Sequence, residues 1–374
     1  MEEYLEGELS ISKNRSLKIV TLCINDNEKI ILNDVKFRPI DYEYASILDG
    51  EDNVKKTLPL RLESYCISPL STFSDNFDVH KLLPRLDIIT SWSFKFIAVT
   101  EGGWLPVGIT QANSHYLLDK NIYNMINSRF AVDKDIKNDF FDLIKDENPI
   151  FNPALFMLEG NTQSFDRAEE ELESKYFEAI GIIRRNLKNV IIPCDSKSLV
   201  QSTSLMLKQL YSNNNFKLKF IQSVIIILYK ETAVKKRKEV IEKLKELAIQ
   251  NNIKRNGILF IAAICAALGH PGNNPAKKIF KPKPPKQYTL KNAYNALSDF
   301  RALDYLMWAI ALNPNKKTYL CTNDKNLVKF WCAIEPSNFK FENNALSHSL
   351  KFRRSLFNHL NDNEFELILQ AINS

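Results

Sequence analysis

The chain has 374 residues, of which 45% are hydrophobic and 25% charged, and a formal net charge of +6. This composition is near the globular average and excludes collagen-like, disordered and disulfide-scaffold proteins, while the length favours about two domains. The modest positive charge favours an anionic partner without requiring one.

Several common site patterns do not occur in the sequence. None of the 10 glycines precedes a lysine, so there is no Walker A loop, and neither G-x-G-x-x-G nor G-x-S-x-G occurs. The six cysteines form no C-x-x-C pair and the five histidines no H-E-x-x-H, which argues against zinc. No apolar run approaches the ~20 residues that cross a bilayer, and acidic residues follow Met1. We therefore expect a reduced, cytoplasmic protein with no membrane partner.

Residues 1–112 form the first predicted region, which is rich in strands. The β-rich runs 17–24 and 29–32 flank an Asn-Asp-Asn turn and predict a hairpin. Residues 92–100 alternate aromatic and polar side chains before the turn at 101–103. We interpret this region as an accessory domain to which the sequence assigns no chemistry.

A different pattern begins near residue 113, where an apolar strand over 115–118 ends at Asp119. Beyond this strand the sequence predicts mainly helices, together with one further strand over 189–192. The expected helices are 122–126, 136–144, 154–158, 164–187, 198–210, 217–229 and 234–250.

The stretch 247–298 contains no acidic residue. Five prolines between residues 270 and 287 predict an extended loop rather than a helix. Two interpretations stay open: a tolerated surface insertion, or a contact with a phosphate backbone, since each lysine on an extended chain can neutralise one phosphate. The lysines concerned are Lys277, Lys278, Lys281, Lys283 and Lys286.

The end of the chain again predicts regular structure. A helix is expected over 296–312, and an apolar strand over 318–321 ends in Thr322-Asn323-Asp324. We expect a helix over 325–332, a strand over 339–341, and helical structure from 345 onward.

Two strands, 115–118 and 318–321, are thus each followed by an aspartate, Asp119 and Asp324. In an open parallel sheet the carboxyl ends of the strands meet at one crevice, so these side chains are predicted to be neighbours. Crowded carboxylates raise one another's pKa unless a cation lies between them, and oxygen ligands suit Mg²⁺ or Mn²⁺. The plainer interpretation is that each aspartate caps the helix that follows it.

Two more acids are candidates for the same site. Asp304 lies within an apolar helix, where a lone charge is costly without a partner or a metal ion. Glu159 follows the apolar run 154–158 and precedes a glycine that can end the helix. Asp299 is a competing assignment for the position of Asp304.

The order of these acids resembles the pattern of PIN (PilT N-terminus) ribonuclease domains. That family has an aspartate closing its first strand, a glutamate on an early helix, an aspartate inside a helix with an alanine-rich end, and a strand ending in T-x-D. The matching positions here are Asp119, Glu159, Asp304 before Ala309 and Ala311, and Thr322-Asn323-Asp324.

The resemblance implies an α/β, three-layer domain with a parallel central sheet over residues 113–374. Its core is residues 113–163 and 290–342, separated by a long, mainly helical insertion over 164–289 and followed by C-terminal helices over 343–374.

The resemblance also implies metal-dependent hydrolysis of phosphodiester bonds, with Asp119, Glu159, Asp304 and Asp324 as the catalytic and metal-binding residues. Thr322 and Asn323, together with the five lysines, would contact the substrate. RNA is favoured, although metal and phosphate contacts do not themselves distinguish RNA from DNA. Elaborated members include toxins and phage-defence effectors, so a regulated endoribonuclease with a regulatory protein partner is expected.

Two alternatives remain. The chain is a catalytically inactive PIN-like module that binds nucleic acid or protein, or the aspartates are simple helix caps in an unrelated α/β domain.

Overall fold

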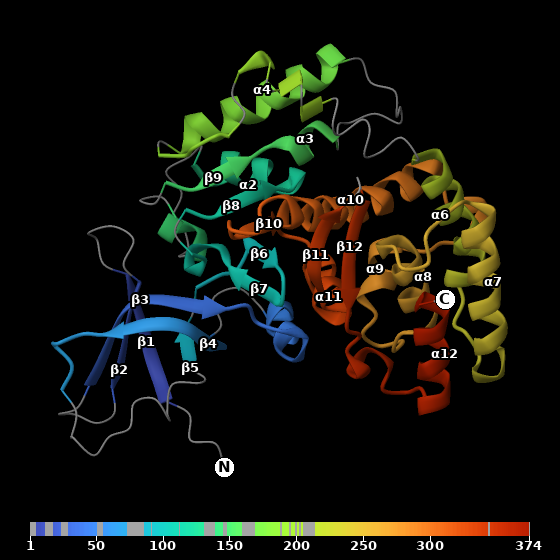
Figure 1. Cartoon of the computed structure of the whole chain (residues 1–374), viewed down its shortest axis with the longest axis horizontal. Coiled ribbons are helices and arrows are strands. Elements are labelled where there is room, and N and C mark those ends of the chain that lie inside the picture. The colour runs from blue at the N-terminus through green and yellow to red at the C-terminus, as the bar shows by residue number, and fades with distance from the viewer. Residues whose placement is uncertain are drawn as a thin grey trace. The chain divides into compact units, whose positions relative to one another are not determined.

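The computed structural model describes residues 5–11, 18–23, 29–50, 55–72, 86–90, 92–111, 113–130, 139–144, 148–158, 169–187, 189–193, 196–198, 200–201, 203–204, 214–342 and 345–373. The chain divides into two compact units (Figure 1). The first comprises Met1–Pro153, Glu178–Cys194 and Asn313–Val328, and the second comprises Ala154–Phe177, Asp195–Leu312 and Lys329–Ser374.

A closed barrel of five strands opens the first unit. Its strands are β1 (Leu5–Ile11), β2 (Lys18–Cys23), β3 (Lys29–Arg38), β4 (Lys56–Ile67) and β5 (Leu86–Thr90). Consecutive strands pair antiparallel, and β1 closes the barrel by pairing parallel to β5. The predicted hairpin within residues 17–32 is confirmed by β2 and β3.

The alternation of buried residues in β3 changes phase partway along the strand. Ile30 and Leu32 are buried, and then Val35 and Phe37 are buried. The pairing register with β4 shifts between Asn33 and Lys36, and Asp34 has a φ of 52°. This irregularity adds a residue on one strand and bends it, as a β-bulge does, so that both halves of β3 keep their apolar side chains inside.

A five-stranded sheet forms the centre of the first unit. Its order is β7-β6-β10-β8-β9, comprising β7 (Gly103–Pro106), β6 (Ile97–Thr100), β10 (Thr318–Thr322), β8 (His115–Leu118) and β9 (Ile150–Asn152). The pairs β10–β8 and β8–β9 are parallel, whereas β10–β6 and β6–β7 are antiparallel. The expected α/β class with parallel pairing is therefore confirmed, but the sheet is mixed rather than wholly parallel.

Strands on both sides of the expected boundary at residue 112 belong to this sheet, because β6 and β7 precede it and β8 follows it. The turn between β6 and β7 requires glycine: Gly103 has a φ of 144°, and a Cβ there would lie 2.0 Å from the Ile40 carbonyl oxygen. Ile40 and Trp104 exchange backbone hydrogen bonds of 2.7 and 3.0 Å at this point.

The strand expected over 189–192 is reduced to a single parallel bridge between Ile150 and Ile191. The hydrogen bonds are from Phe151 N to the Ile191 oxygen, 2.9 Å, and from Ile191 N to the Pro149 oxygen, 2.9 Å. These bonds place Ile191 beside the edge strand β9.

The second unit consists mainly of helices. They include α3 (Ala154–Leu158), α6 (Asn214–Leu228), α7 (Arg237–Gln250), α8 (Ile258–Leu268), α9 (Pro275–Phe280), α10 (Leu290–Leu312) and α12 (Asp362–Asn373). The helices α4 (Glu169–Asn186) and α11 (Lys325–Ile334) contribute residues to both units.

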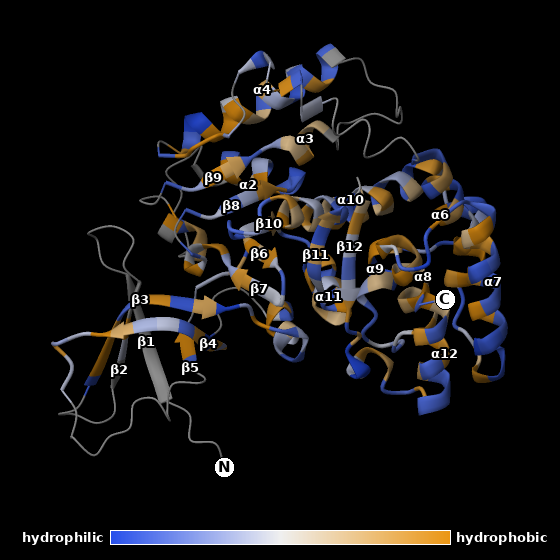
Figure 2. Ribbon diagram, viewed as in Figure 1, coloured by the Kyte–Doolittle hydropathy of each residue, from blue (hydrophilic) through white to orange (hydrophobic). Residues whose placement is uncertain are grey.

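Burial along these helices follows the sequence. In α8 almost every side chain is apolar and buried. On α7, hydrophilic residues, blue in Figure 2, separate the buried Ile241, Leu244 and Ala248. A helix that is apolar on all sides belongs at the centre of a unit, and one with a single apolar stripe at its surface.

Two predictions about this unit are wrong. The stretch 270–287 was expected to be extended, yet Pro275–Phe280 is a helix, because Asn274 caps it and Pro275 occupies its first turn, where no backbone N–H is needed. The chain from Ala345 was expected to be helical, yet Ala345–Leu350 is strand β12, paired antiparallel with β11 (Pro336–Glu342). β11 confirms the strand expected over 339–341.

Two other expected helices fall partly on residues that the structure does not describe. Of 136–144, the described part contains a 3₁₀-helix at Phe140–Ile144. Most of 198–210 lies outside the described residues. Among the described helices, none has the length and apolar character needed to cross a membrane.

Candidate functional site

The parallel part of the sheet contains a point where the chain reverses its order. From β8 the chain passes through α2 (Lys120–Phe130) to β9 on one side, whereas β10 lies on the other side of β8. In open α/β sheets, ligands bind outside the carboxyl ends of the strands at such a switch point. Asp119 follows β8 and Asp324 follows β10, so both aspartates lie at the carboxyl ends that flank this point.

Asp119 is held at the start of α2 by backbone and side-chain contacts. Its N–H donates to the Cys321 oxygen of β10 at 3.0 Å, and its carbonyl oxygen accepts from Ile122 N at 3.0 Å. Its carboxylate Oδ2 accepts a 2.6 Å hydrogen bond from Thr322 Oγ1. Only 7% of the residue is exposed. The side chain is therefore fixed in place and largely removed from water.

Asp324 lies at the start of α11 and caps that helix. Its Oδ1 accepts from Asn326 N at 2.8 Å and from Leu327 N at 3.0 Å. Its own N–H donates to Thr322 Oγ1 at 3.0 Å. The capping role that the sequence left open is thus present, and the same residue shares the Thr322 hydroxyl with Asp119.

The Thr322 hydroxyl group joins the two strand ends. It is fully buried, donates to Asp119 and accepts from the Asp324 backbone. Asn323, between the two, is exposed in the turn before α11. We call Asp119, Thr322, Asn323 and Asp324 the strand-end site.

Electrostatics at the strand-end site penalise the ionised form of Asp119. Burial raises the pKa of this carboxyl, the hydrogen bond from Thr322 lowers it, and the charge of Asp324 raises it again, so that the net shift is upward. Backbone N–H groups of Asn121 and Lys120 favour the ionised form but do not reverse the shift. A cation beside the two carboxylates would offset this penalty.

A further carboxylate, which the sequence analysis missed, lies in the same unit. Asp139 is fully buried, accepts a short hydrogen bond from the Ser93 hydroxyl, and accepts from Lys95 N at 3.2 Å and Phe141 N at 2.8 Å. Burial, and then the charges of Asp119 and Asp139, raise the pKa of Cys321 well above its usual value. No motif surrounds Asp139, and its contacts identify it as the cap of the 3₁₀-helix at Phe140–Ile144.

Asp304 belongs to the second unit, on α10. Its Oδ2 lies 3.3 Å from Lys217 Nζ of α6, and its side chain is 34% exposed. The charge expected to need a partner within an apolar helix thus has one in Lys217. Asp299, the competing assignment, is half-buried on the same helix, and Glu159 lies outside the described residues.

The five predicted substrate-binding lysines also belong to the second unit. Lys277 is half-buried on α9, and the other four, Lys278, Lys281, Lys283 and Lys286, are exposed on α9 and on the segment that follows it, which includes a 3₁₀-helix at Pro285–Gln287. Lys281 ends α9 in a left-handed conformation, with a φ of 47°.

The strand-end site offers ligands of the kind that a divalent metal ion binds. Two carboxylates, a hydroxyl and an amide supply the oxygen ligands that Mg²⁺ and Mn²⁺ prefer. Within the described ranges, however, no three histidine, cysteine, aspartate or glutamate side chains come together as a metal-binding group. The ligand types at this site therefore suit Mg²⁺ or Mn²⁺, with Asp119 and Asp324 as the two carboxylates.

Comparison of the chain with protein-family models, curated proteins and solved structures found no match.

Proposed function

We propose that the chain is a metal-dependent nuclease whose strand-end site binds Mg²⁺ or Mn²⁺ and cleaves phosphodiester bonds. The proposal depends on one observation, the buried Asp119 carboxylate joined through the Thr322 hydroxyl to Asp324. Asp119 and Thr322 are 203 positions apart along the chain and lie at the carboxyl ends of β8 and β10, beside the topological switch point of the sheet.

The raised pKa of Asp119 supports a cation-binding role. A fold that only needed a helix cap at this position would gain nothing from placing a second carboxylate within electrostatic reach of a buried one. Ion binding would favour the ionised form of Asp119, and the hydrogen bond from Thr322 would hold its carboxylate in one orientation.

In this proposal Asp119 and Asp324, both in the first unit, hold the ion. A bound Mg²⁺ or Mn²⁺ would lower the pKa of a water molecule and offset the negative charge of the phosphate. Thr322 orients Asp119, and Asn323, exposed in the turn, can donate a hydrogen bond to a phosphate oxygen.

RNA is the proposed substrate because the order of the four acidic residues resembles the pattern of PIN ribonuclease domains. The exposed Lys278, Lys281, Lys283 and Lys286 are close together in sequence and suit contacts to successive phosphates. Such contacts strengthen binding without reading sequence or sugar, so single-stranded DNA is the necessary comparison substrate.

A second candidate is an inactive nucleic-acid-binding module. It is favoured by the capping bonds of Asp324, which engage Oδ1 with the helix backbone of α11. This candidate predicts binding of RNA or DNA without cleavage under any metal ion.

The test is an assay of labelled single-stranded RNA and DNA with Mg²⁺, Mn²⁺ or EDTA. We expect RNA cleavage that EDTA abolishes and that Asp119→Asn and Asp324→Asn each reduce by at least about 100-fold, as for loss of a group that holds a catalytic ion. The matched control is Glu242→Gln, which removes an exposed carboxylate that pairs with Lys245 on α7. Cleavage that survives EDTA, or that all three substitutions reduce equally, would overturn the proposal.

A further inference from the structure

The second unit contains a small pocket of its own, whose lining includes one of the five predicted lysines, Lys277. It lies among the segment before α7, the end of α8, the start of α9 and the segment before α12, and has a volume of about 70 Å³. Its polar lining comes from Glu231, Thr232, Arg237, Asn274, Lys277 and His359. The volume is room for roughly five water molecules, far less than a drug-sized ligand needs.

Asn274 fixes one wall of the pocket. Its Nδ2 donates to the Cys265 and Ala266 carbonyl oxygens at 2.9 and 3.2 Å, and its Oδ1 accepts from Lys277 N at 2.9 Å. A Cβ on Gly269 would lie 2.5 Å from the Cys265 oxygen and 2.8 Å from Asn274 Nδ2. The end of α8 and the start of α9 are therefore locked together, and the backbone of Lys277 is held beside the pocket.

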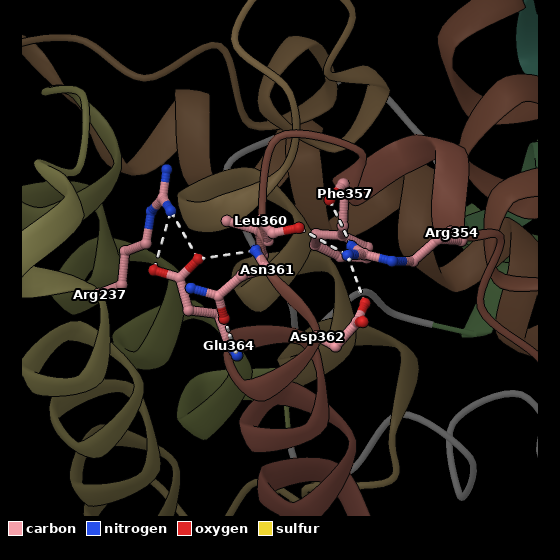
Figure 3. Close-up of polar contacts among 7 residues, drawn as sticks. All are labelled: Arg237, Arg354, Phe357, Leu360, Asn361, Asp362 and Glu364. Carbon is pink, nitrogen blue, oxygen red and sulfur yellow. Dashed lines mark hydrogen bonds and ion pairs between the residues drawn. The ribbon is translucent and has the colours of Figure 1, made fainter.

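Arg354 fixes the turn that precedes α12 (Figure 3). Arg354 donates to the Phe357 and Leu360 carbonyl oxygens at 2.6 and 2.5 Å and to Asp362 Oδ1 at 3.1 Å. These bonds clamp the turn that carries His359. The pocket is thus bounded by segments that are hydrogen-bonded in place.

Arg237 uses only part of its donor capacity. Its Nη1 donates to both Glu364 carboxylate oxygens, at 2.9 and 2.8 Å. Figure 3 shows the other terminal nitrogen turned away from Glu364, and no hydrogen bond joins it to any residue in the described part of the chain. Because a guanidinium carries five N–H donors, this one retains donors for a further acceptor.

The His359 ring carries a second nitrogen atom that has hydrogen-bonding capacity left for a ligand. Its Nδ1 is buried and has no hydrogen-bond partner among the described residues. Burial lowers the pKa of His359, and the charges of Arg237 and His270 lower it further, against the opposing effect of Glu364. Arg237 and Lys277 line the pocket as cations, and Glu231 is the acidic member of the lining.

We propose that this pocket binds a single phosphate group, with Arg237, Lys277 and His359 as its ligands. A tetrahedral oxyanion matches the available volume, and charged N–H donors from arginine and lysine are the groups that bind it most strongly. The phosphate is either free or the 5′-terminal phosphate of a nucleic acid. This inference goes beyond the proposed nuclease activity and depends only on residues of the second unit.

The test is calorimetric titration of the full chain with inorganic phosphate, at constant ionic strength and with EDTA present, so that phosphate held through a metal ion is not counted. We expect Lys277→Gln and His359→Gln each to weaken binding by about tenfold, the size of one charge-assisted hydrogen bond. The matched control is Lys243→Gln, which makes the same change at an exposed residue of α7 that pairs with Glu246 outside the lining. Circular dichroism verifies folding, and Thr232→Val replaces any variant that fails to fold.

Two outcomes would overturn the proposal: no heat of binding for phosphate beyond that for chloride, or equal weakening by Lys277→Gln and Lys243→Gln. The source of the phosphate is then distinguished with two oligonucleotides of one sequence, with and without a 5′-phosphate. A preference of about tenfold for the phosphorylated strand that Lys277→Gln removes identifies the terminal phosphate. Equal binding of the two strands, with inorganic phosphate still bound, identifies free phosphate.

Discussion

Replacement of Thr322 by valine removes the hydroxyl that joins the two strand ends while nearly preserving side-chain shape. The change breaks the 2.6 Å bond to Asp119 and leaves the Asp324 N–H without its acceptor at 3.0 Å. A hydrogen bond to a charged group contributes about 1.5–3 kcal/mol, and a stranded N–H costs about 1 kcal/mol or more. We therefore expect Thr322→Val to lower the free energy of unfolding by about 3 kcal/mol at pH 7.

The matched control is Thr322→Ser, which keeps the hydroxyl and removes one buried methyl group. Its expected cost is about 1 kcal/mol, from lost burial and a small cavity. The difference between the two variants, about 2 kcal/mol, measures the hydroxyl group itself.

The effect of Thr322→Val also has a predicted dependence on pH. The bond from Thr322 favours the ionised form of Asp119 and lowers a pKa that burial raises. Without the hydroxyl that pKa rises further, so the destabilisation is fully present where Asp119 is ionised and shrinks as pH falls through its raised pKa. Urea unfolding in EDTA at a series of pH values from neutral to acid measures this. A cost equal to that of Thr322→Ser, or one that grows toward acid pH, would refute the reasoning.

Three further predictions concern single carboxylates and their partners. Because burial raises the pKa of Asp119, the ionised side chain destabilises the metal-free protein above the ordinary aspartate pKa. Asp119→Asn should therefore leave the melting temperature in EDTA at pH 7 unchanged or raise it. A clear fall in melting temperature would contradict this. Asp324→Asn should keep the helix cap of α11 and change unfolding by less than about 0.5 kcal/mol, whereas Asp324→Ala should cost about 1 kcal/mol in urea unfolding. Burial raises the pKa of Glu364, but hydrogen bonds from Arg237 and the Asn361 backbone outweigh burial and hold that pKa below its usual value. The Arg237–Glu364 ion pair therefore stabilises the fold fully above the ordinary glutamate pKa, and this stabilisation is lost as pH falls through the lowered pKa. Arg237→Gln should lower the free energy of unfolding by about 2 kcal/mol at pH 7, since the paired side chains are only 13% and 19% exposed. The difference in unfolding free energy from the wild-type protein should shrink at acid pH. A difference that stays constant with pH would exclude the ion pair as its cause.

The strands that carry the strand-end site could be predicted from sequence because their signals are local. Residues 115–118 and 318–321 are short apolar runs, each closed by polar turn residues, and the structure has β8 and most of β10 there. Their juxtaposition followed from a general rule about parallel sheets. The shared Thr322 hydroxyl could not be foreseen, because it depends on the register that opposes Cys321 to Leu118.

Predictions that failed did so where a local rule was applied too broadly. Proline was treated as excluding a helix over 270–287, yet a proline in the first turn after an Asn cap favours one. In Ala345–Leu350, exposure alternates residue by residue, which is the period of a strand, although small polar residues weaken that signal. The Lys217 partner of Asp304 required knowledge of how α6 packs on α10, and no local pattern carries that information.

The most direct measurement is a crystal structure of the chain grown with Mn²⁺, with anomalous scattering used to locate the ion. The account predicts an anomalous peak at the strand-end site, with carboxylate oxygens of Asp119 and Asp324 at roughly 2.1 Å. A peak bound elsewhere, or an ordered strand-end site without manganese at millimolar concentration, would contradict the claim that these aspartates form a metal centre.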